Sequence, residues 1–463
     1  MRADLLNDPV DGLDEALAAV DGFDGVLVDG LLRPGPAQAA GLAGLADAVA
    51  GSPLAGRVAE AAGKTAAGAG GEDHFVALAA ARTALLGSVH DALVARIGEA
   101  VGRPPAGESG AAAATGADHA ANLHAAARSW LCDLARAGWR GIDHELVAGA
   151  APVVSAMLPD PALRRLAALL DGFAAELAAS CPGASLERVP VRRWADLWSR
   201  AVLLTLPGAA SAPAVGEATG RLLPLGVDVQ EHATAVQAQV HAVFEPADGG
   251  APRLVRASAS APKPDTVLGA GLWQLLRPHL SLLAAVGEGR AVDLDAMPVT
   301  GEGDLLWDDA RARAGEPAEV FATARVALPA AAFPTAPLDR HPARIAVPVL
   351  LEGYAVEEDG GAVVFQVAGQ RLVVDTDRVP AAGPLTPEAV ASSGACVGLL
   401  RWDAGEFLLQ PLAVERTVRK RTVAVHAGAW AGGTTDKAGV RAEKAATDAV
   451  KVLRERAGKL LRK

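Results

Sequence analysis

The chain contains 463 residues, of which 51% are hydrophobic and only 4% aromatic, and its formal net charge is −11. At roughly 100–200 residues per domain, this length accommodates two to four domains with sizeable cores. The first residues, Met1-Arg-Ala-Asp, lead into no long apolar region, and no stretch reaches about 18 uninterrupted apolar residues. We therefore expect a cytoplasmic protein with neither a signal peptide nor a membrane association.

The three cysteines, Cys132, Cys181 and Cys396, lie far apart in the sequence and form no Cys-x-x-Cys unit. Their odd number and wide spacing favour free, mostly buried thiols in a reducing compartment over a disulfide framework.

Residues 1–205 are predicted to form a mostly helical domain. Within 74–100, apolar residues recur at steps of three, four and seven, which places them on one helical face: Phe75, Leu78, Leu85, Val89, Leu93 and Ile97. Further helices are expected at 116–138, between Pro152 and Pro161, and at 161–180, where Asp160-Pro161 is a helix-start signal. Residues 20–30 are compatible with one short strand, and residues 101–115 with a flexible connector.

Residues 220–425 are predicted to form a β-rich domain with one inserted helix at 267–286, kinked at Pro278. Apolar and polar residues alternate in 236–244, which indicates a half-buried strand within a hairpin spanning 227–260. A three-stranded meander is expected at 343–376, and a second hairpin joins 397–402 to 407–415. Short strands with close turns are typical of a small antiparallel barrel or sandwich, so the predicted fold class is α+β.

The clearest charge pattern is an acidic body followed by a basic tail. Residues 1–415 carry a net charge of −20, and residues 416–463 carry +9. After a glycine-rich hinge at 428–436, residues 437–463 are predicted to form a basic amphipathic helix, the third unit of the chain. We predict that the basic residues of this region bind a partner: Arg416, Arg419, Lys420, Arg421, Lys451, Arg454, Lys459 and Arg462.

Three uses of the basic tail remain open. The first is docking on an acidic surface, either of a partner or of the protein's own body. The second is contact with the phosphates of nucleic acid, and the third is a helix that is only solvated. The acidic body repels a polyanion, and the predicted helix holds no aromatic residue to stack on bases. Both observations favour an acidic protein surface over nucleic acid.

No motif for nucleotide binding or catalysis is complete. Gly63-Lys64-Thr65 lacks the upstream glycine of a P-loop, because position 58 is Val, so a helix-breaking linker is the favoured interpretation. There is no Gly-x-Ser-x-Gly sequence of the kind that positions a nucleophilic serine. His119 and His124 would point in different directions on one helix, at about 3.6 residues per turn. The sequence therefore predicts no catalytic, cofactor-binding or metal-binding residue and no cofactor.

The tryptophans are interpreted as packing anchors. Trp194 and Trp198, four residues apart, are expected in the core in preference to an exposed cation–π surface. Trp130 and Trp139 are expected to be two separate anchors of the helical domain.

Residues 74–100 and 121–147 (ANLHAAARSWLCDLARAGWRGIDHELV) carry a resemblance. They resemble uncharacterised high-GC bacterial proteins that accompany MoxR-like AAA+ ATPases, VWA-domain proteins and SWIM zinc-finger proteins. The chain has no Walker motif, no Asp-x-Ser-x-Ser pattern and no Cys-x-Cys…Cys-x-His pattern. The resemblance therefore implies a companion of these proteins, and it transfers no functional residues.

Three functional hypotheses follow. The first is a non-catalytic scaffold or adaptor of a cytoplasmic bacterial complex, accessory to an AAA+ ATPase system. The second is an enzyme whose active site is dispersed along the chain and is not visible as a motif. The third is a nucleic-acid-binding module that uses the basic tail. The absence of an assembled catalytic motif and the charge asymmetry favour the adaptor.

Overall fold

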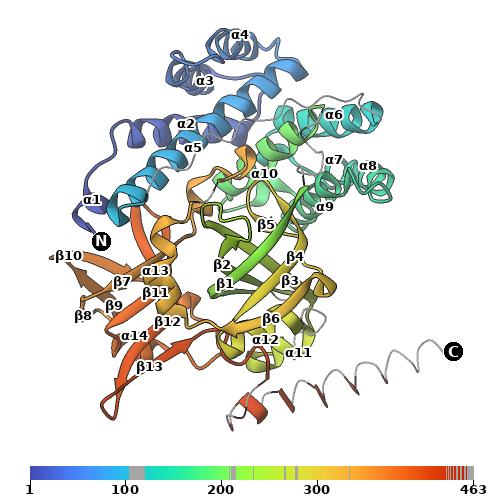
Figure 1. Cartoon of the computed structure of the whole chain (residues 1–463). Coiled ribbons are helices and arrows are strands. Elements are labelled where there is room, and N and C mark those ends of the chain that lie inside the picture. Colours follow the sequence, from blue (N-terminus) through green and yellow to red (C-terminus); the bar gives the residue numbers. More distant parts are fainter. Residues whose placement is uncertain are drawn as a thin grey trace.

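The computed structural model describes residues 1–103, 120–207, 209, 215–232, 234–264, 267–276, 280–332 and 334–433, with residues 435, 437, 439–441, 443–444, 447–448, 451–452 and 455. Helices occupy the N-terminal half and two sheets the C-terminal half, so the predicted α+β class is confirmed. In Figure 1 the helices of the N-terminal half lie above the sheets. None of the helices in these ranges has the length and apolar character needed to cross a membrane.

The helical half is built around one long helix. It comprises α1 (Asp4–Asn7), α2 (Leu13–Asp29), α3 (Pro36–Ala48), α4 (Ala55–Ala66), α5 (Glu72–Val101), α6 (Ala121–Ala137), α7 (His144–Ala148), α8 (Ala150–Met157), α9 (Arg164–Ala179) and α10 (Val191–Leu204). The apolar stripe predicted in 74–100 is buried along α5. The periodicity therefore identified both the helix and its buried face.

Three local predictions in this half are wrong. Residues 20–30 form the end of α2 instead of a strand, because Val20, Phe23 and Val26 recur at helical steps and are buried together. The helix expected at Pro161 begins at Arg164, because the Asp160 carboxylate accepts a hydrogen bond from the Ala162 amide at 2.9 Å and forms a turn first.

The third error is the Gly63-Lys64-Thr65 segment, which we interpreted as a helix-breaking linker. These residues lie inside α4, and Thr65 is completely buried. A helical backbone cannot wrap a phosphate, so the absence of a P-loop here is a property of the fold as well as of the spacing.

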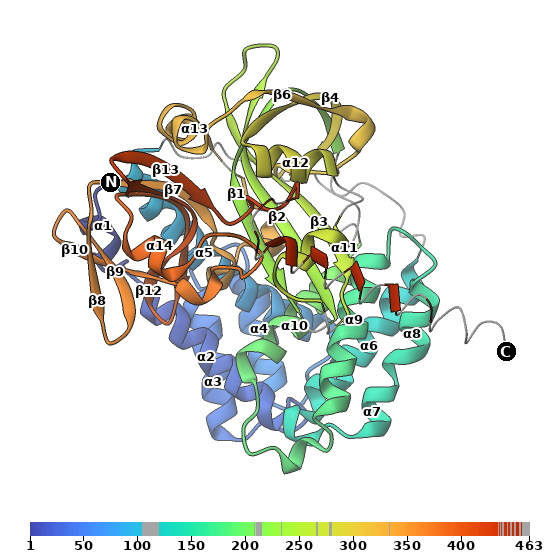
Figure 2. The ribbon, with the colours of Figure 1, turned by 90° about the horizontal axis from the view of Figure 1, so that it is seen from below.

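The first sheet holds six strands: β1 (Val215–Glu231), β2 (Ala235–Pro246), β3 (Arg253–Pro262), β4 (Arg290–Thr300), β5 (Asp304–Leu305) and β6 (Ala312–Pro317). Its order is β1-β2-β3-β5-β4-β6. Strand β4 also pairs with β1, so β1, β2, β3, β5 and β4 form a continuous ring of paired strands. The long β1–β2–β3 ribbon confirms the strands expected within 227–260. In Figure 2 this ribbon runs down the centre of the view toward the helices of the N-terminal half.

The second sheet holds seven strands: β7 (Val347–Glu352), β8 (Ala355–Asp359), β9 (Ala362–Val367), β10 (Gln370–Val374), β11 (Ala395–Asp403), β12 (Glu406–Val418) and β13 (Arg421–His426). Its order is β7-β11-β12-β10-β9-β8, with β13 paired to β12. The β11–β12 hairpin is confirmed. The predicted meander is only partly right, because Gly353, at φ +68°, breaks its first arm and β7 pairs with β11.

The β-rich half contains several short helices where one was predicted: α11 (Leu272–Leu275), α12 (Leu280–Glu288), α13 (Val320–Val326) and α14 (Pro387–Ala391). The first two correspond to the helix expected at 267–286. Pro278, where we expected a kink, lies outside the described residues. The connector 101–115 lies largely outside them as well.

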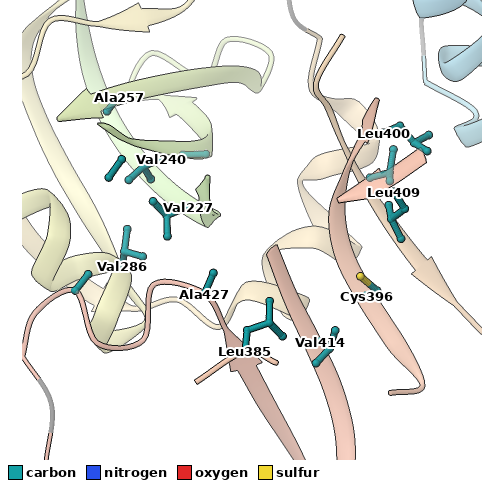
Figure 3. Packing of buried hydrophobic residues seen from close by; sticks show 14 of the residues in the cluster. Val227, Val240, Ala257, Val286, Leu385, Cys396, Leu400, Leu409, Val414 and Ala427 are labelled. Carbon is teal, nitrogen blue, oxygen red and sulfur yellow. The ribbon is translucent and has the colours of Figure 1, made fainter. Parts of the chain in front are cut away.

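One hydrophobic core joins the two sheets. In Figure 3, Val227 of β1 and Val414 of β12 face each other across Ala427 and Leu385, and all four are buried. The same core includes Leu6 of α1 and Ile97 near the end of α5. The first half of α5, from Phe75 to Leu86, belongs to a separate core of the helical half, and its buried residues from Val89 onward belong to the core of the sheets. The chain therefore folds with α5 shared between the two halves.

Charged contacts also connect the halves. Arg200 of α10 donates to Asp339 at 3.1 Å, and Arg344 donates to the same carboxylate oxygen at 2.8 Å. His341 lies 3.6 Å from Asp196 of α10. Burial lowers the pKa of His341 to about 4, so this ring is neutral at pH 7.

Candidate functional site

The structure brings four of the predicted basic residues together on one hairpin. We had placed Arg416, Arg419, Lys420 and Arg421 before the hinge and predicted no strand beyond 415. Instead β12 continues to Val418, Arg419 and Lys420 form a two-residue turn, and β13 begins at Arg421. Strand β13 was missed although its alternation of Thr422, Val423, Ala424 and Val425 fits a strand. We call residues 416–423 the basic hairpin.

The turn of the basic hairpin has an unusual composition. Arg419 and Lys420 both have positive φ angles, +51° and +67°. Two-residue hairpins with two positive φ angles are usually made of Asn-Gly, because a Cβ atom is disfavoured in the left-handed region by roughly 1–2 kcal/mol. The chain therefore holds two long cationic side chains at the tip, in positions where backbone stability favours small residues.

The part of the chain that the structure describes does not neutralise the four cations. Among the described residues, none of them has an ion-pair partner. Elsewhere arginines are commonly paired, as Arg221 is with Glu245 at 2.7 Å and Arg371 with Asp359 at 2.6 Å. The hairpin is thus a local positive surface on an acidic chain. Figure 1 shows it extending past the rest of the second sheet at the lower left.

The nearest carboxylate in the sequence faces away from these cations. Glu415 lies on the opposite face of β12 from Arg416, because side chains alternate along a strand. It accepts a hydrogen bond from Arg325 at 2.6 Å, and Glu352 accepts another at 2.9 Å. The bonds to Glu415 and Glu352 raise the pKa of Arg325. Glu415 is therefore occupied and does not offset the hairpin charge.

One face of the basic hairpin combines charge with apolar surface. Arg416 pairs with Val423 and Val418 with Arg421, so these four side chains share a face. Val418 and Val423 are 39% and 40% exposed. The surface can therefore attract an anion and contact an apolar group at the same time.

The remaining predicted partner-binding residues are in the tail. The described residues within 437–455 are helical, as predicted, and Lys451 is exposed. Arg454, Lys459 and Arg462 lie outside the described residues. Their role stays a prediction.

A cleft of about 660 Å³ lies between the first sheet and residues 377–381. Gln230, Gln237 and Ser260 occupy one face of β1, β2 and β3 and line it. This volume is within the roughly 300–1,000 Å³ of small-molecule sites, but the lining mixes small apolar and polar residues and has no Phe, Tyr or Trp.

A buried polar cluster lies against this cleft. Asp228 of β1, only 3% exposed, accepts hydrogen bonds from Gln410 at 2.8 Å and from Arg401 at 3.0 Å, and Gln230 donates at 3.1 Å. Arg401 also donates to Gln410 at 2.5 Å. Both carboxylate oxygens of Asp228 are thus engaged. The cluster connects the two sheets, and its carboxylate is held by hydrogen bonds from both of them.

His241 is buried next to this cluster but is not placed for proton transfer. Burial lowers its pKa to about 3, outweighing the attraction of Asp228. The ring is therefore neutral at pH 7. His232 follows β1, whereas His241 lies on β2.

Other candidates from the sequence are structural. Cys132 and Cys396 are buried and Cys181 is half-buried, and all three are free thiols. Burial raises the pKa of Cys132 to about 12, which opposes thiolate chemistry. Within the described ranges, no group of three or more His, Cys, Asp or Glu is arranged to hold a metal ion. His119 lies outside those ranges.

The tryptophans form the centre of the helical core. Trp194 and Trp198 are buried, as predicted. Trp130 and Trp139 were expected to be separate anchors, but both pack edge-on against Phe173, at 6.3 and 6.1 Å between ring centroids. The intervening turn at Gly138, φ +72°, redirects the chain and allows this convergence.

No protein-family model, no curated protein and no solved structure matches the chain. The site is therefore defined by geometry alone.

Proposed function

We propose that the protein is a non-catalytic adaptor that docks on an acidic surface of a partner protein through the basic hairpin. The observation that carries this proposal is the set of four basic side chains that have no ion-pair partner among the described residues. Many other arginines of the chain are ion-paired, whereas the hairpin holds four basic side chains within six consecutive positions. Such a patch accelerates and orients encounter with a negative surface.

A protein partner is favoured over nucleic acid. Residues 1–415 carry a net charge of −20, which repels a long polyanion lying across the molecule. The hairpin contains no aromatic residue on which bases stack. Its exposed valines instead provide the apolar contact that protein interfaces use at their centres.

The adaptor is favoured over an enzyme with a dispersed site. The cleft beside Asp228 is the place where such a site would be expected, but Asp228 is held by Arg401 and Gln410. The resemblance carried by residues 74–100 and 121–147 extends the proposal to a cytoplasmic bacterial complex that includes an AAA+ ATPase. The helical half would supply a second binding surface in that complex.

The proposal is tested with defined anionic probes and the full-length protein. Binding of a fluorescent polyglutamate peptide and of a short DNA duplex is measured by anisotropy at low and high salt. We expect the peptide to bind at about 50 mM salt and to be released at about 500 mM. The double variant Arg419→Glu/Lys420→Glu should not bind it.

The matched control reverses two exposed charges on α4, Arg57→Glu/Lys64→Glu, which changes the net charge equally at a distant place. This control should still bind polyglutamate. Equal binding by both double variants would contradict docking at the hairpin, and preference for the duplex would replace the adaptor with a nucleic-acid-binding function.

A further inference from the structure

The outer edge of β13 is an open strand edge. Val418 and Arg421 flank a two-residue turn, and residues in that position exchange both backbone hydrogen bonds. The alternation of an antiparallel pair then turns the N–H and C=O groups of Thr422 and Ala424 away from β12. The Ala427 amide, which donates to the Leu412 carbonyl at 2.9 Å, follows the same alternation.

These outward groups are available. Thr422 and Ala424 are exposed, and neither backbone has a hydrogen-bond partner among the described residues. Strand β10 pairs with β12 near Leu408 and Leu409, well before the segment that pairs with β13. No described strand therefore covers this edge. Exposed strand edges accept further strands unless charge, proline or a bulge prevents it.

We infer that the edge of β13 accepts an extended acidic segment of the partner protein as an additional strand of the second sheet. This inference rests on the proposed docking function and specifies how the partner is bound. Backbone hydrogen bonds to Thr422 and Ala424 would supply affinity, and side chains at alternate positions would supply specificity.

The occupant is identified by charge and by the faces of the strand. On β13, Arg421 and Val423 lie on the same face. A strand added beside them presents every second side chain to that face. The preferred segment therefore has an acidic residue opposite Arg421 and an apolar residue opposite Val423, separated by one residue. Arg419 and Lys420 at the tip extend the preference for negative charge.

A second copy of this chain is a poor occupant. Pairing two β13 edges would bring Arg421 and the two cations of the turn close to the same residues of the other copy. Like charges on facing strands are destabilising, and basic side chains on edges are a common protection against self-association. The same charges that oppose self-pairing attract an acidic strand.

The test compares two short fluorescent peptides of identical composition. In the patterned peptide, Glu and Val alternate at every second position, separated by Thr; in the scrambled peptide they fall on both faces. We expect the patterned peptide to bind the full-length protein about tenfold more tightly. In hydrogen exchange, the patterned peptide should protect the amides of Thr422 and Ala424, whose N–H groups point away from β12.

The variant Ala424→Pro removes one outward donor and leaves every charge in place. Proline is tolerated on an edge strand when its missing N–H faces solvent. We expect this variant to lose the preference for the patterned peptide, and the control Ala424→Val to retain it. A second measurement needs no change in the protein. Alternate N–H groups of a bound strand point toward β13 or away from it. Peptides N-methylated at one of the two alternating sets of residues should therefore lose binding, and peptides N-methylated at the other set should keep it.

The outcomes separate this inference from the proposed function. If both peptides bind equally, neither set of N-methyl groups matters and no amide is protected, then attraction is by charge alone and strand addition is wrong. If neither these peptides nor polyglutamate binds, the docking function itself fails, and the hairpin charges serve only to keep the edge from pairing.

Discussion

Replacement of Asp228 by Asn should destabilise the junction of the two sheets far more than the loss of one surface charge. Asp228 is 3% exposed, and the side chain of its partner Arg401 is 14% exposed. The nearby Asp375 offers little compensation to Arg401, because Arg378 donates to it at 2.9 Å. Removing one member of a buried ion pair typically costs about 3–5 kcal/mol. We expect the Asp228→Asn variant to lose this much unfolding free energy.

The Asn substitution also creates a conflict of donors. Asp228 accepts from Gln410 on one oxygen and from Arg401 and Gln230 on the other. An Asn side chain has a single acceptor oxygen, so its amide group must face one of these donors. Urea unfolding followed by tryptophan fluorescence measures the loss, and hydrogen exchange shows whether protection falls first in β1, β11 and β12.

Two comparisons make the measurement specific. Asp359→Asn removes the partner of Arg371 in an ion pair whose side chains are 63% and 54% exposed, and should change stability by no more than about 1 kcal/mol. Combining Asp228→Asn with Arg401→Met should cost less than the two single changes added together, because the unpaired buried charge is gone. A loss below about 1 kcal/mol for Asp228→Asn alone would refute the reasoning.

Three further predictions concern pH, packing and thiol reactivity. The pKa of His341 is about 4 in the folded protein and 6.5 ordinarily. As the pH decreases from 6.5 to 4, the unfolded chain therefore binds a proton at this ring before the folded protein does, and the free energy of unfolding falls. The His341→Gln variant should recover about 2 kcal/mol of unfolding free energy at pH 5, measured by urea titration. Gly383→Ala places a Cβ 2.0 Å from the Ala427 carbonyl oxygen and should cost about 1–3 kcal/mol, whereas Gly394→Ala, with nothing within 4 Å, should be neutral in the same titrations. A thiol reagent at pH 8 should modify half-buried Cys181 first and the buried Cys132 and Cys396 only on unfolding; equal rates in the native protein would contradict the burial.

Several features of the fold could be predicted because their signals are local. The stripe from Phe75 to Ile97 determined α5, since a helix brings residues three and four apart onto one side. The alternation in 236–244 likewise determined β2. The division into helical and β-rich halves followed from where these two periods occur. The excess of basic residues after 415 was also visible in the sequence, because charge depends only on composition.

Other features depended on contacts between distant residues. Strand β7 pairs with β11 and not with β8, which follows it in the sequence. The turn at Gly353 redirects the chain, and the pairing with β11 is stabilised by burial of apolar side chains that are distant in the sequence. Asp228 and Arg401 are 173 positions apart, and no spacing rule connects them. The misassigned strand at 20–30 shows the converse, because a short apolar run fits either period until its packing partners are known.

The sequence by itself determined the long, strongly periodic helices and strands, such as α5 and β2, and where basic residues are frequent. Only the tertiary structure decided that the four basic residues share a hairpin and that Glu415 faces Arg325 instead of them. It also decided that no described strand covers the outer edge of β13. The physical reason is that helix and strand periodicity depends on residues only two to four positions apart. Strand pairing and charge neutralisation depend instead on which distant residues the folded core brings together.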